Sequence, residues 1–305
     1  MYDVIIVGGG PAGMTAGLYS VRNGKSALII EKGGFGGQIT FSPKVENIPG
    51  FNSVSGNEFA DKFLDQIMEQ GVEVELDTVV KIEKEENMFK VFTEDENVFE
   101  SKAVILATGV KHRMLGLEGE EDLVGNGISF CAVCDGDFYK DRIVCVAGGG
   151  NSALQEAILL SSKCSKVIML QDMPYFTGEQ KLQDILSLKD NVEFHVNTKI
   201  EALITENDEI KGVKIEDTNT KEKKDIYCDG LFVAIGLIPE NGPFENLANV
   251  NDWGYFDSKE DCVTKTEGLF VAGDCRSKMI RQVTTASSDG AVAALAAIKY
   301  IDSMI

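Results

Sequence analysis

A duplicated glycine-rich segment limits what this chain can fold into more than any other feature. Residues 3–32 read DVIIVGGGPAGMTAGLYS…SALIIEK, and residues 143–172 read IVCVAGGGNSALQEAILL…KVIMLQD. Each copy has an apolar strand, a glycine turn, a segment with helical periodicity and a second strand. Two copies at long separation indicate a duplicated nucleotide-binding unit, because a solenoid needs many copies at a short period.

The repeat predicts an α/β fold with two Rossmann-like domains, each of the three-layer ββα type. Strands that are apolar on both faces and alternate with helices form parallel sheets covered by helices. Residues 72–99 and 192–227 alternate apolar and polar side chains, which predicts a small antiparallel layer in each domain. The segment GLFVAGDC, which begins at Gly268, has no glycine turn of its own. We therefore expect it to complete the first sheet.

The domain limits follow from this arrangement and from two segments rich in Gly and Pro. These segments are VKHRMLG (110–116) and GLIPENGP (236–243). The prediction is a discontinuous first domain and an inserted second domain that carries a C-x-x-C pair: 1–113 with 241–305, and 114–240.

Length and charge exclude several classes of protein. The chain has 305 residues, enough for two domains, and 29 basic against 49 acidic residues give a net charge of −20. Nucleic acids and anionic membranes both need a cationic surface, so neither is expected as a partner. No apolar run reaches the length of a membrane span, and the first residues lead directly into a strand without a signal peptide. We expect a cytoplasmic protein.

The first glycine turn predicts a dinucleotide site. Gly8-x-Gly10-x-x-Gly13 follows a strand and opens a helix, and Glu31 ends the next strand. The glycines let a pyrophosphate approach backbone N–H groups at the helix N-terminus, while the acidic side chain accepts hydrogen bonds from a ribose.

The surrounding motifs favour a flavin over a nicotinamide at this site. The loops GGFGGQIT and VENIPGF offer Gln38 and Asn47 for hydrogen bonds to a ring edge. A strand ending in ATG closes at Gly109, where a side chain would clash with a cofactor. VAGDC places Asp274 at a strand end within reach of a polyol hydroxyl. The helix that follows RQ presents an N-terminus that would stabilise negative charge on a reduced flavin.

The C-x-x-C pair, Cys131 and Cys134, predicts redox chemistry. Two cysteines three residues apart can form a disulfide, and one lowers the pKa of the other. Zinc is the alternative, but it needs two further ligands, and the chain has only His112 and His195 and no second C-x-x-C. Asp135 is a candidate acid that protonates a departing thiolate, or else a cap of the following turn.

The order of these motifs resembles that of the low-molecular-weight thioredoxin reductases. CAVCDG and RQVTTA are the most specific of them, and the likeness runs the full length of the chain. The resemblance implies an FAD domain built from both chain ends, a homodimer, and thioredoxin or a similar redoxin as substrate. It also implies that Cys131 and Cys134 are the redox pair, that Asp135 is the acid and that Cys134 is the sulfur nearer the flavin.

The motifs and the resemblance together give a set of expected FAD-binding residues. They are Gly8, Gly10, Pro11, Ala12, Gly13, Glu31, Lys32, Gly37, Gln38, Asn47, Thr108, Gly109, Gly273, Asp274, Arg281, Gln282 and Val283.

The second glycine turn departs from the family pattern. The family reads His-Arg-Arg at the end of the following strand, with another Arg a few residues on, to bind the 2′-phosphate of NADPH. Here Gln171, Asp172 and Met173 stand at these positions, with Thr177 at the fourth. No arginine occurs between residues 143 and 275 to compensate. A carboxylate repels a 2′-phosphate, so NADPH is disfavoured.

Two electron donors remain. An acidic side chain such as Asp172 suits the 2′-hydroxyl of NADH, although Gln171 at the usual position of a Glu weakens this alternative. A chain that keeps the dithiol and lacks the NADPH motif resembles the ferredoxin-dependent flavin thioredoxin reductases, and we favour ferredoxin. A flavin-binding redox sensor without turnover is a third possibility.

Docking of an acidic ferredoxin on an acidic chain would need a local basic patch. The candidates fall into two groups near predicted site segments: Lys111, Arg113, Lys140 and Arg142, or Arg276 and Lys278.

Overall fold

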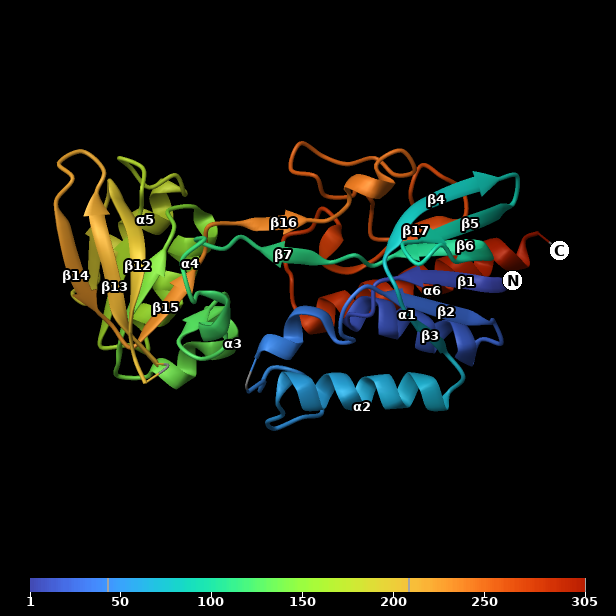
Figure 1. Cartoon of the computed structure of the whole chain (residues 1–305), viewed down its shortest axis with the longest axis horizontal. Helices are drawn as coiled ribbons and strands as arrows, with labels where there is room; N and C mark the ends of the chain where they lie inside the picture. Colours follow the sequence, from blue (N-terminus) through green and yellow to red (C-terminus); the bar gives the residue numbers. More distant parts are fainter. Residues whose placement is uncertain (43, 208, 305) are drawn as a thin grey trace. The chain divides into compact units, whose positions relative to one another are not determined.

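The computed structural model describes residues 1–42, 44–207 and 209–304, which form two compact units (Figure 1). Unit 1 contains Met1–Thr40, Ile48–Lys111 and the chain from Ile238 onward. Unit 2 contains Phe41–Asn47 and His112–Leu237. The units thus divide at 111/112 and 237/238, whereas the sequence predicts 113/114 and 240/241.

Unit 1 is built on a seven-stranded sheet of order β3-β2-β1-β6-β5-β4, with β17 paired to β6. Its strands are β1 (Tyr2–Val7), β2 (Ala27–Glu31), β3 (Glu73–Leu76), β4 (Val79–Glu85), β5 (Met88–Thr93), β6 (Val98–Leu106) and β17 (Leu269–Val271). Its helices are α1 (Pro11–Arg22), α2 (Gly56–Glu69) and α6 (Val283–Asp302), with 3-10 turns η1 (Gly37–Phe41), η4 (Gly242–Phe244) and η5 (Gly273–Cys275).

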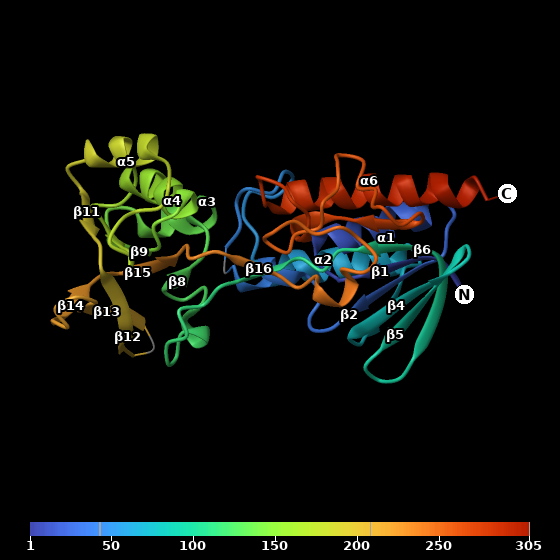
Figure 2. The same ribbon diagram turned by 90° about the horizontal axis from the view of Figure 1, so that it is seen from above.

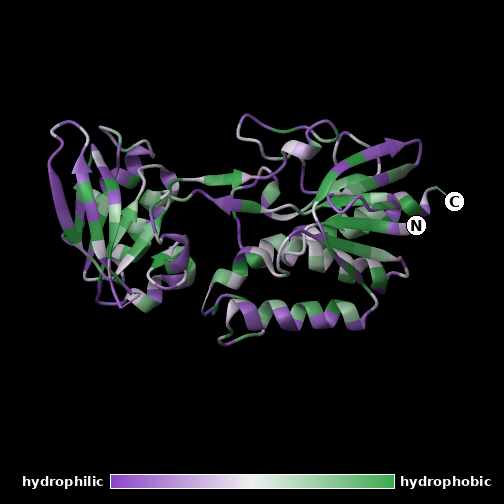
Figure 3. Ribbon diagram, viewed as in Figure 1, coloured by the Kyte–Doolittle hydropathy of each residue, from purple (hydrophilic) through white to green (hydrophobic). Residues whose placement is uncertain are grey.

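The central strands β1 and β6 are apolar on both faces because both faces are covered. Val4 and Ile6 of β1 pack in one core with α1 and α6, and Ile5 packs in a second core on the opposite face. The hydropathy colours show these strands as a green centre (Figure 3). Helices α1 and α6 lie side by side (Figure 2) and touch through Gly290, where a Cβ would come within 2.1 Å of the Ala12 carbonyl oxygen. This close contact fixes the helix that follows the RQ motif against the first glycine turn.

Strand β6 joins the parallel and antiparallel parts of this sheet. Its first residues pair antiparallel with β5, and Ser101 to Leu106 pair parallel with β1. In unit 2 the equivalent stretch is broken into two strands, β14 (Lys223–Tyr227) and β15 (Gly230–Val233), which belong to separate sheets.

Unit 2 has a five-stranded sheet of order β11-β10-β9-β15-β8 and a three-stranded sheet of order β12-β13-β14. Its remaining strands are β8 (Ile128–Ser129), β9 (Ile143–Ala147), β10 (Lys166–Leu170), β11 (Val192–His195), β12 (Thr198–Glu206) and β13 (Glu209–Asp217). Its helices are α3 (Ala132–Asp135), α4 (Asn151–Ser161) and α5 (Gln180–Ser187), with 3-10 turns η2 (Glu121–Leu123) and η3 (Gly136–Tyr139). The two segments that connect the units, β7 (Val110–His112) and β16 (Leu237–Pro239), pair with each other.

The α/β fold with parallel sheets and small antiparallel layers is confirmed, as is the parallel pairing of β17 with β6. The prediction that residues 72–99 and 192–227 are antiparallel throughout is wrong at the start of each stretch. Strands β3 and β11 pair parallel with β2 and β10 instead of joining the antiparallel layer. Each follows a helix, α2 or α5, and a helical crossover returns the chain parallel to the strand it left.

None of the helices in the described part of the chain is both long enough and apolar enough to cross a membrane.

Candidate active site

The dithiol lies at the start of α3 in unit 2. Cys131 and Cys134 form a disulfide, and Cys131 is the N-cap of the helix, where its Sγ accepts a hydrogen bond from the Cys134 N–H at 3.2 Å. Val133, between the two cysteines, is 60% exposed. The disulfide next to this exposed apolar side chain is half-buried.

The cysteines and histidines that could bind zinc are engaged in other interactions. The two sulfurs are bonded to each other, His195 contacts the Glu193 carboxylate at 2.7 Å, and His112 stacks on Phe130. Burial lowers the pKa of His112 to about 4. Among the described residues, no group of three or more His, Cys, Asp or Glu side chains could hold a metal ion.

Asp135 is buried directly after the dithiol. Its Oδ2 accepts a hydrogen bond from the Ser129 hydroxyl at 2.6 Å, and Ser129 Oγ also accepts from the Cys131 N–H at 3.1 Å. Asp135 makes no side-chain cap of the following 3-10 turn, so the capping interpretation is wrong. Its Oδ1 is buried without a hydrogen-bond partner among the described residues. Burial raises its pKa, against the effect of the Ser129 hydrogen bond.

Glu156 is a second buried carboxyl group near the dithiol, and the sequence reasoning missed it. It lies on α4, and its Oε2 is buried without a hydrogen-bond partner among the described residues. Burial, and then the charge of Asp135, raise its pKa to about 8. The sequence spacing could have revealed it. Glu156 follows Ala153 by three residues and precedes Leu160 by four, and this spacing places its carboxyl group on the buried face of the helix.

The first glycine turn connects β1 to α1 in unit 1. A Cβ at Gly8 would lie 2.3 Å from the Ala107 carbonyl oxygen, and one at Gly13 would lie 1.8 Å from the Gly8 oxygen, so neither position accepts a side chain. At Gly10, the N-cap of α1, no described heavy atom lies within 4 Å of an ideal Cβ. With Pro11 in the first turn, the helix N-terminus faces open space.

Glu31 ends β2 beside this turn. Its Oε2 accepts the Gly9 N–H at 2.6 Å and its Oε1 accepts the Gly33 N–H at 2.8 Å. The next residue, Lys32, forms an ion pair with Glu240 at 2.5 Å. The carboxylate that was expected to read a ribose is therefore held at the glycine turn by two backbone donors.

Asp274 lies in η5, after β17; its side chain is partly exposed, but the carboxyl oxygen Oδ1 is buried. Its Oδ1 has no hydrogen-bond partner among the described residues, and the Lys278 ammonium nitrogen is 4.0 Å away. Burial raises its pKa to about 6, although Lys278 and Arg281 oppose the shift. The preceding Gly273 packs close to Ala12, since a Cβ there would lie 2.8 Å from the Ala12 Cβ.

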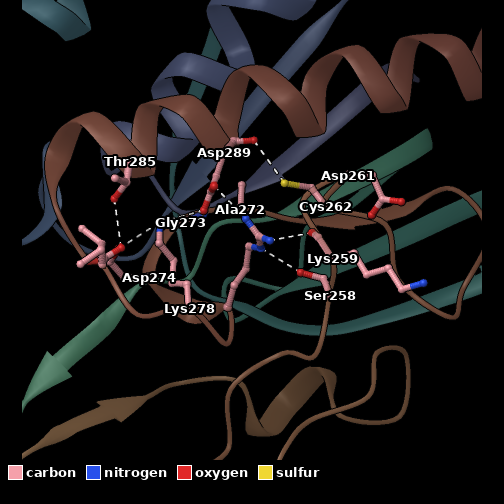
Figure 4. Close-up of polar contacts among 12 residues, drawn as sticks. Ser258, Lys259, Asp261, Cys262, Ala272, Gly273, Asp274, Lys278, Thr285 and Asp289 are labelled. Carbon is pink, nitrogen blue, oxygen red and sulfur yellow. Dashed lines mark hydrogen bonds and ion pairs between the residues drawn. The ribbon is translucent and has the colours of Figure 1, made fainter.

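Asp289 on α6 organises this end of unit 1 and was also missed (Figure 4). Its Oδ2 accepts the Gly273 N–H at 3.0 Å and contacts Lys278 at 3.0 Å, while Oδ1 contacts Arg276 at 2.7 Å. Arg276 is 4% exposed and also donates to Ser258. Arg276 and Lys278 are therefore internal partners of Asp289, and their prediction as an exposed docking patch is wrong.

The other predicted FAD residues fall into three places. Thr108 and Gly109 follow β6, and the Thr108 hydroxyl donates to Asn241 at 2.8 Å. Arg281, Gln282 and Val283 form the entry to α6, where Gln282 makes a capping box and Arg281 donates to the Asp274 carbonyl at 3.3 Å. Gly37 and Gln38 lie in η1, and Asn47 lies in the segment Phe41–Asn47 that belongs to unit 2.

Unit 1 has features that fit a flavin-adenine dinucleotide. The open N-terminus of α1 at Gly10 provides room and N–H donors for a pyrophosphate. Glu31 provides a carboxylate for a ribose, and the unpartnered buried oxygen of Asp274 provides an acceptor for a hydroxyl donor. A buried polar oxygen without a partner is costly, and a bound hydroxyl removes that cost.

The second glycine turn is built alike but has a different neighbour. Gln171 takes the position of Glu31, is 6% exposed, and its amide donates to the Tyr175 carbonyl at 3.3 Å. A Cβ at Gly149 would lie 2.5 Å from the Gln171 amide nitrogen. Glu179 is tied to Asn151 at the α4 N-terminus by two hydrogen bonds, of 2.7 and 3.1 Å. The side chains at this turn therefore bind their own loop.

The comparison with known proteins covers nearly the whole chain. Residues 2–290 match the pyridine nucleotide-disulphide oxidoreductase family. The chain belongs to this family. The thioredoxin reductases of Listeria monocytogenes and Bacillus subtilis are 38% and 37% identical over 304 residues, which is 100% of this chain and 95% and 96% of theirs.

A solved structure and a further relative agree with this assignment. The crystal structure of thioredoxin reductase from Streptococcus pyogenes has a TM-score of 0.93 and 38% identity, and the alignment covers 99% of both chains. A 34.2 kDa protein in a rubredoxin operon of Clostridium pasteurianum is 39% identical over 299 residues, 98% of this chain and 97% of that protein. The thioredoxin reductases of this family are FAD-binding flavoproteins, and FAD is the cofactor of the chain.

Proposed function

We propose that the chain is a thioredoxin reductase that takes electrons from reduced ferredoxin and reduces thioredoxin, or a similar redoxin, through Cys131 and Cys134. The observation that carries the choice of donor is the second glycine turn. Gln171 is buried and bound to its own loop, Asp172 is exposed, and no arginine occurs between residues 143 and 275. A 2′-phosphate would meet a carboxylate there and no guanidinium.

The residues that would hold FAD are those of unit 1. The turn from Gly8 to Gly13 would bind the pyrophosphate, Glu31 the ribose, and Asp274 a hydroxyl of the linking chain. The entry to α6, from Arg281 to Val283, would face the flavin. When bound, the flavin supplies a group that accepts single electrons from a protein carrier and passes a pair to a disulfide.

The chain's own residues carry the thiol chemistry. Reduction of the Cys131–Cys134 disulfide takes two electrons and two protons and gives two thiols. A thiolate of the pair then attacks the disulfide of the redoxin, and the mixed disulfide is broken by the second cysteine. Asp135 would give a proton to the departing sulfur, because its raised pKa keeps the acid form available nearer to neutral pH.

A second donor, NADH, is supported by one observation. Asp172 is exposed at the end of β10, where an acidic side chain can accept hydrogen bonds from a 2′-hydroxyl. Against it stands Gln171, which takes the usual acidic position and is occupied with the Tyr175 carbonyl. The Clostridium pasteurianum relative is named for a rubredoxin operon, which associates that protein with a one-electron carrier.

The test is anaerobic reduction of the purified flavoprotein by NADPH, NADH or chemically reduced ferredoxin, followed by the visible flavin absorption. We expect bleaching with ferredoxin alone, and then reduction of added thioredoxin. Prompt bleaching by NADH that Asp172→Ala weakens would replace ferredoxin with NADH, and efficient bleaching by NADPH would refute the argument from the missing arginines.

Exchange of both cysteines for serine is the control for function. Bleaching should persist while thioredoxin reduction stops, whereas a redox sensor would show no turnover even with the cysteines intact.

We further propose a homodimer that works in the cytoplasm, and sedimentation of the flavoprotein would reveal a monomer if the dimer is wrong.

A further inference from the structure

Two carboxyl groups are buried together next to the dithiol. Asp135 ends α3, and Glu156 lies on α4, which packs against α3. One oxygen of each, Asp135 Oδ1 and Glu156 Oε2, is inaccessible and has no hydrogen-bond partner in the described parts of the chain. The other oxygen of Asp135, Oδ2, accepts the hydrogen bond of the Ser129 hydroxyl at 2.6 Å. Such atoms are costly to leave unpaired, and protonation of a carboxyl supplies a donor for one of them.

The charged groups on the elements around α4 do not neutralise this pair. Lys163, which follows α4, forms an ion pair with the exposed Asp137 of η3. Lys166 of β10 contacts Glu193 at 2.5 Å.

The remaining elements add no buried cation beside Glu156. Helix α5 carries Lys181 and Asp184, both exposed, and β9 carries no charged side chain. Tyr139 of η3 has its pKa raised to about 12, so it is neutral. The charge that acts on the pKa of Glu156 is that of Asp135, which has the same sign.

These surroundings keep a proton on the Glu156 and Asp135 carboxyl groups at neutral pH. Burial and the Asp135 charge raise the pKa of Glu156 to about 8, and burial raises that of Asp135. Two interacting acids titrate as a pair, so the proton belongs to both.

We propose that Glu156 is a positioning residue for thiol–disulfide exchange, which shares a proton with Asp135 at the end of α3. The proposal rests on the proposed function for its substrate. Across one exchange, two electrons and two protons pass from the enzyme dithiol to the redoxin disulfide. The acid pair gives a proton to the first departing thiolate and recovers one from the second cysteine thiol, so it ends as it began.

The first experiment needs neither electron donor nor redoxin. Protein labelled with ¹³C at the glutamate side-chain carboxyl is titrated by NMR with the disulfide intact. Glu156→Gln identifies the resonance, and Glu118→Gln, which removes an exposed carboxyl of the same unit, is the matched control. We expect one resonance, lost only in Glu156→Gln, with a midpoint near pH 8. A midpoint near that of an ordinary glutamate would overturn the proposal.

The second experiment measures exchange itself. Dithiol reduced chemically is mixed with oxidised thioredoxin at pH 6–9, and a single turnover is followed. In Glu156→Gln the amide holds no titratable proton and does not repel a charge on Asp135. The fall of the exchange rate at alkaline pH should therefore begin at a lower pH than in wild type. At pH 8 the rate should fall at least about tenfold. An unchanged pH profile would contradict the proposal even if the variant were slower throughout.

Thermal stability gives a further readout of the proton that the folded chain retains. Between the unfolded pKa of a glutamate and about 8, the folded chain keeps a proton that the unfolded chain loses, so wild-type stability falls as pH rises through this window. Glu156→Gln should show a weaker fall. If wild type reduces no thioredoxin but the NMR midpoint lies near pH 8, the proposed function fails while the shared proton stands.

Discussion

At the scale of single residues, Asp289 holds together segments of unit 1 that are far apart in the sequence. Its carboxylate meets the Gly273 N–H, the Lys278 ammonium and the guanidinium of Arg276, which is 4% exposed. Asp289→Asn would leave a buried cation without its counter-charge. We expect a loss of roughly 3–5 kcal/mol in the free energy of unfolding, measured by urea denaturation of the apoprotein.

Glu58→Gln is the control for this prediction. It breaks an exposed helical ion pair, with Lys62 at 2.7 Å, and exposed pairs contribute little. We expect no measurable change. If Asp289→Asn behaved like the control, the cluster of Figure 4 would not be a stabilising element.

Residue types at fixed spacing were readable from the sequence, but their partners were not. The cysteine spacing predicted that Cys131 and Cys134 can form a disulfide, which the structure contains. Glu31 was predicted at the end of a strand, where it lies, but its backbone partner Gly9 was not predicted. Arg276 looked like surface charge because nothing in the sequence links it to Asp289 on α6. The acidity of Glu156 depends on burial and on Asp135, which only the packing of α4 on α3 produces.

At the scale of elements, the two glycine turns give a matched pair of substitutions. Gly10→Ala adds a methyl group where no described atom lies within 4 Å, and Gly150→Ala adds one 3.8 Å from the Thr177 hydroxyl, so the apoprotein should tolerate both. Only the first should displace a pyrophosphate. We expect Gly10→Ala to lower FAD content and affinity by at least about tenfold, a loss of about 1.4 kcal/mol in binding.

Gly150→Ala should leave both the FAD content and ferredoxin-dependent turnover unchanged. Absorbance ratios of the purified proteins and titration of the apoprotein with FAD would measure this. Equal FAD binding by Gly10→Ala and wild type would place the pyrophosphate elsewhere. Loss of ferredoxin-dependent turnover in Gly150→Ala alone would contradict the expectation that the second turn has no part in this reaction.

The existence of each strand was easier to predict than its partner. Alternation of apolar and polar residues is expected at the edge of a parallel sheet as well as in an antiparallel layer, because both leave one face exposed. Strands β3 and β11 are such edges, and the helices before them decide their direction. The alternating stretch 192–227 ends where β14 ends, whereas the stretch 72–99 ends inside β6, and the sequence did not indicate that β6 runs on unbroken.

At the scale of the whole molecule, net charge should govern how an acidic ferredoxin approaches. The chain has a net charge of −20, and two of its basic residues, Arg276 and Lys278, form ion pairs with Asp289 inside unit 1. Repulsion between two acidic proteins weakens as the screening length falls from about 30 Å at 0.01 M salt to about 10 Å at 0.1 M. The rate of flavin reduction by ferredoxin should therefore rise with salt over this range. Stopped-flow absorption would measure this rate, and reduction of the disulfide by an uncharged thiol reagent is the control that should not depend on salt.

A rate that falls with salt would instead show a local basic docking site, and charge reversal of the exposed Lys140 and Arg142 should then abolish that dependence.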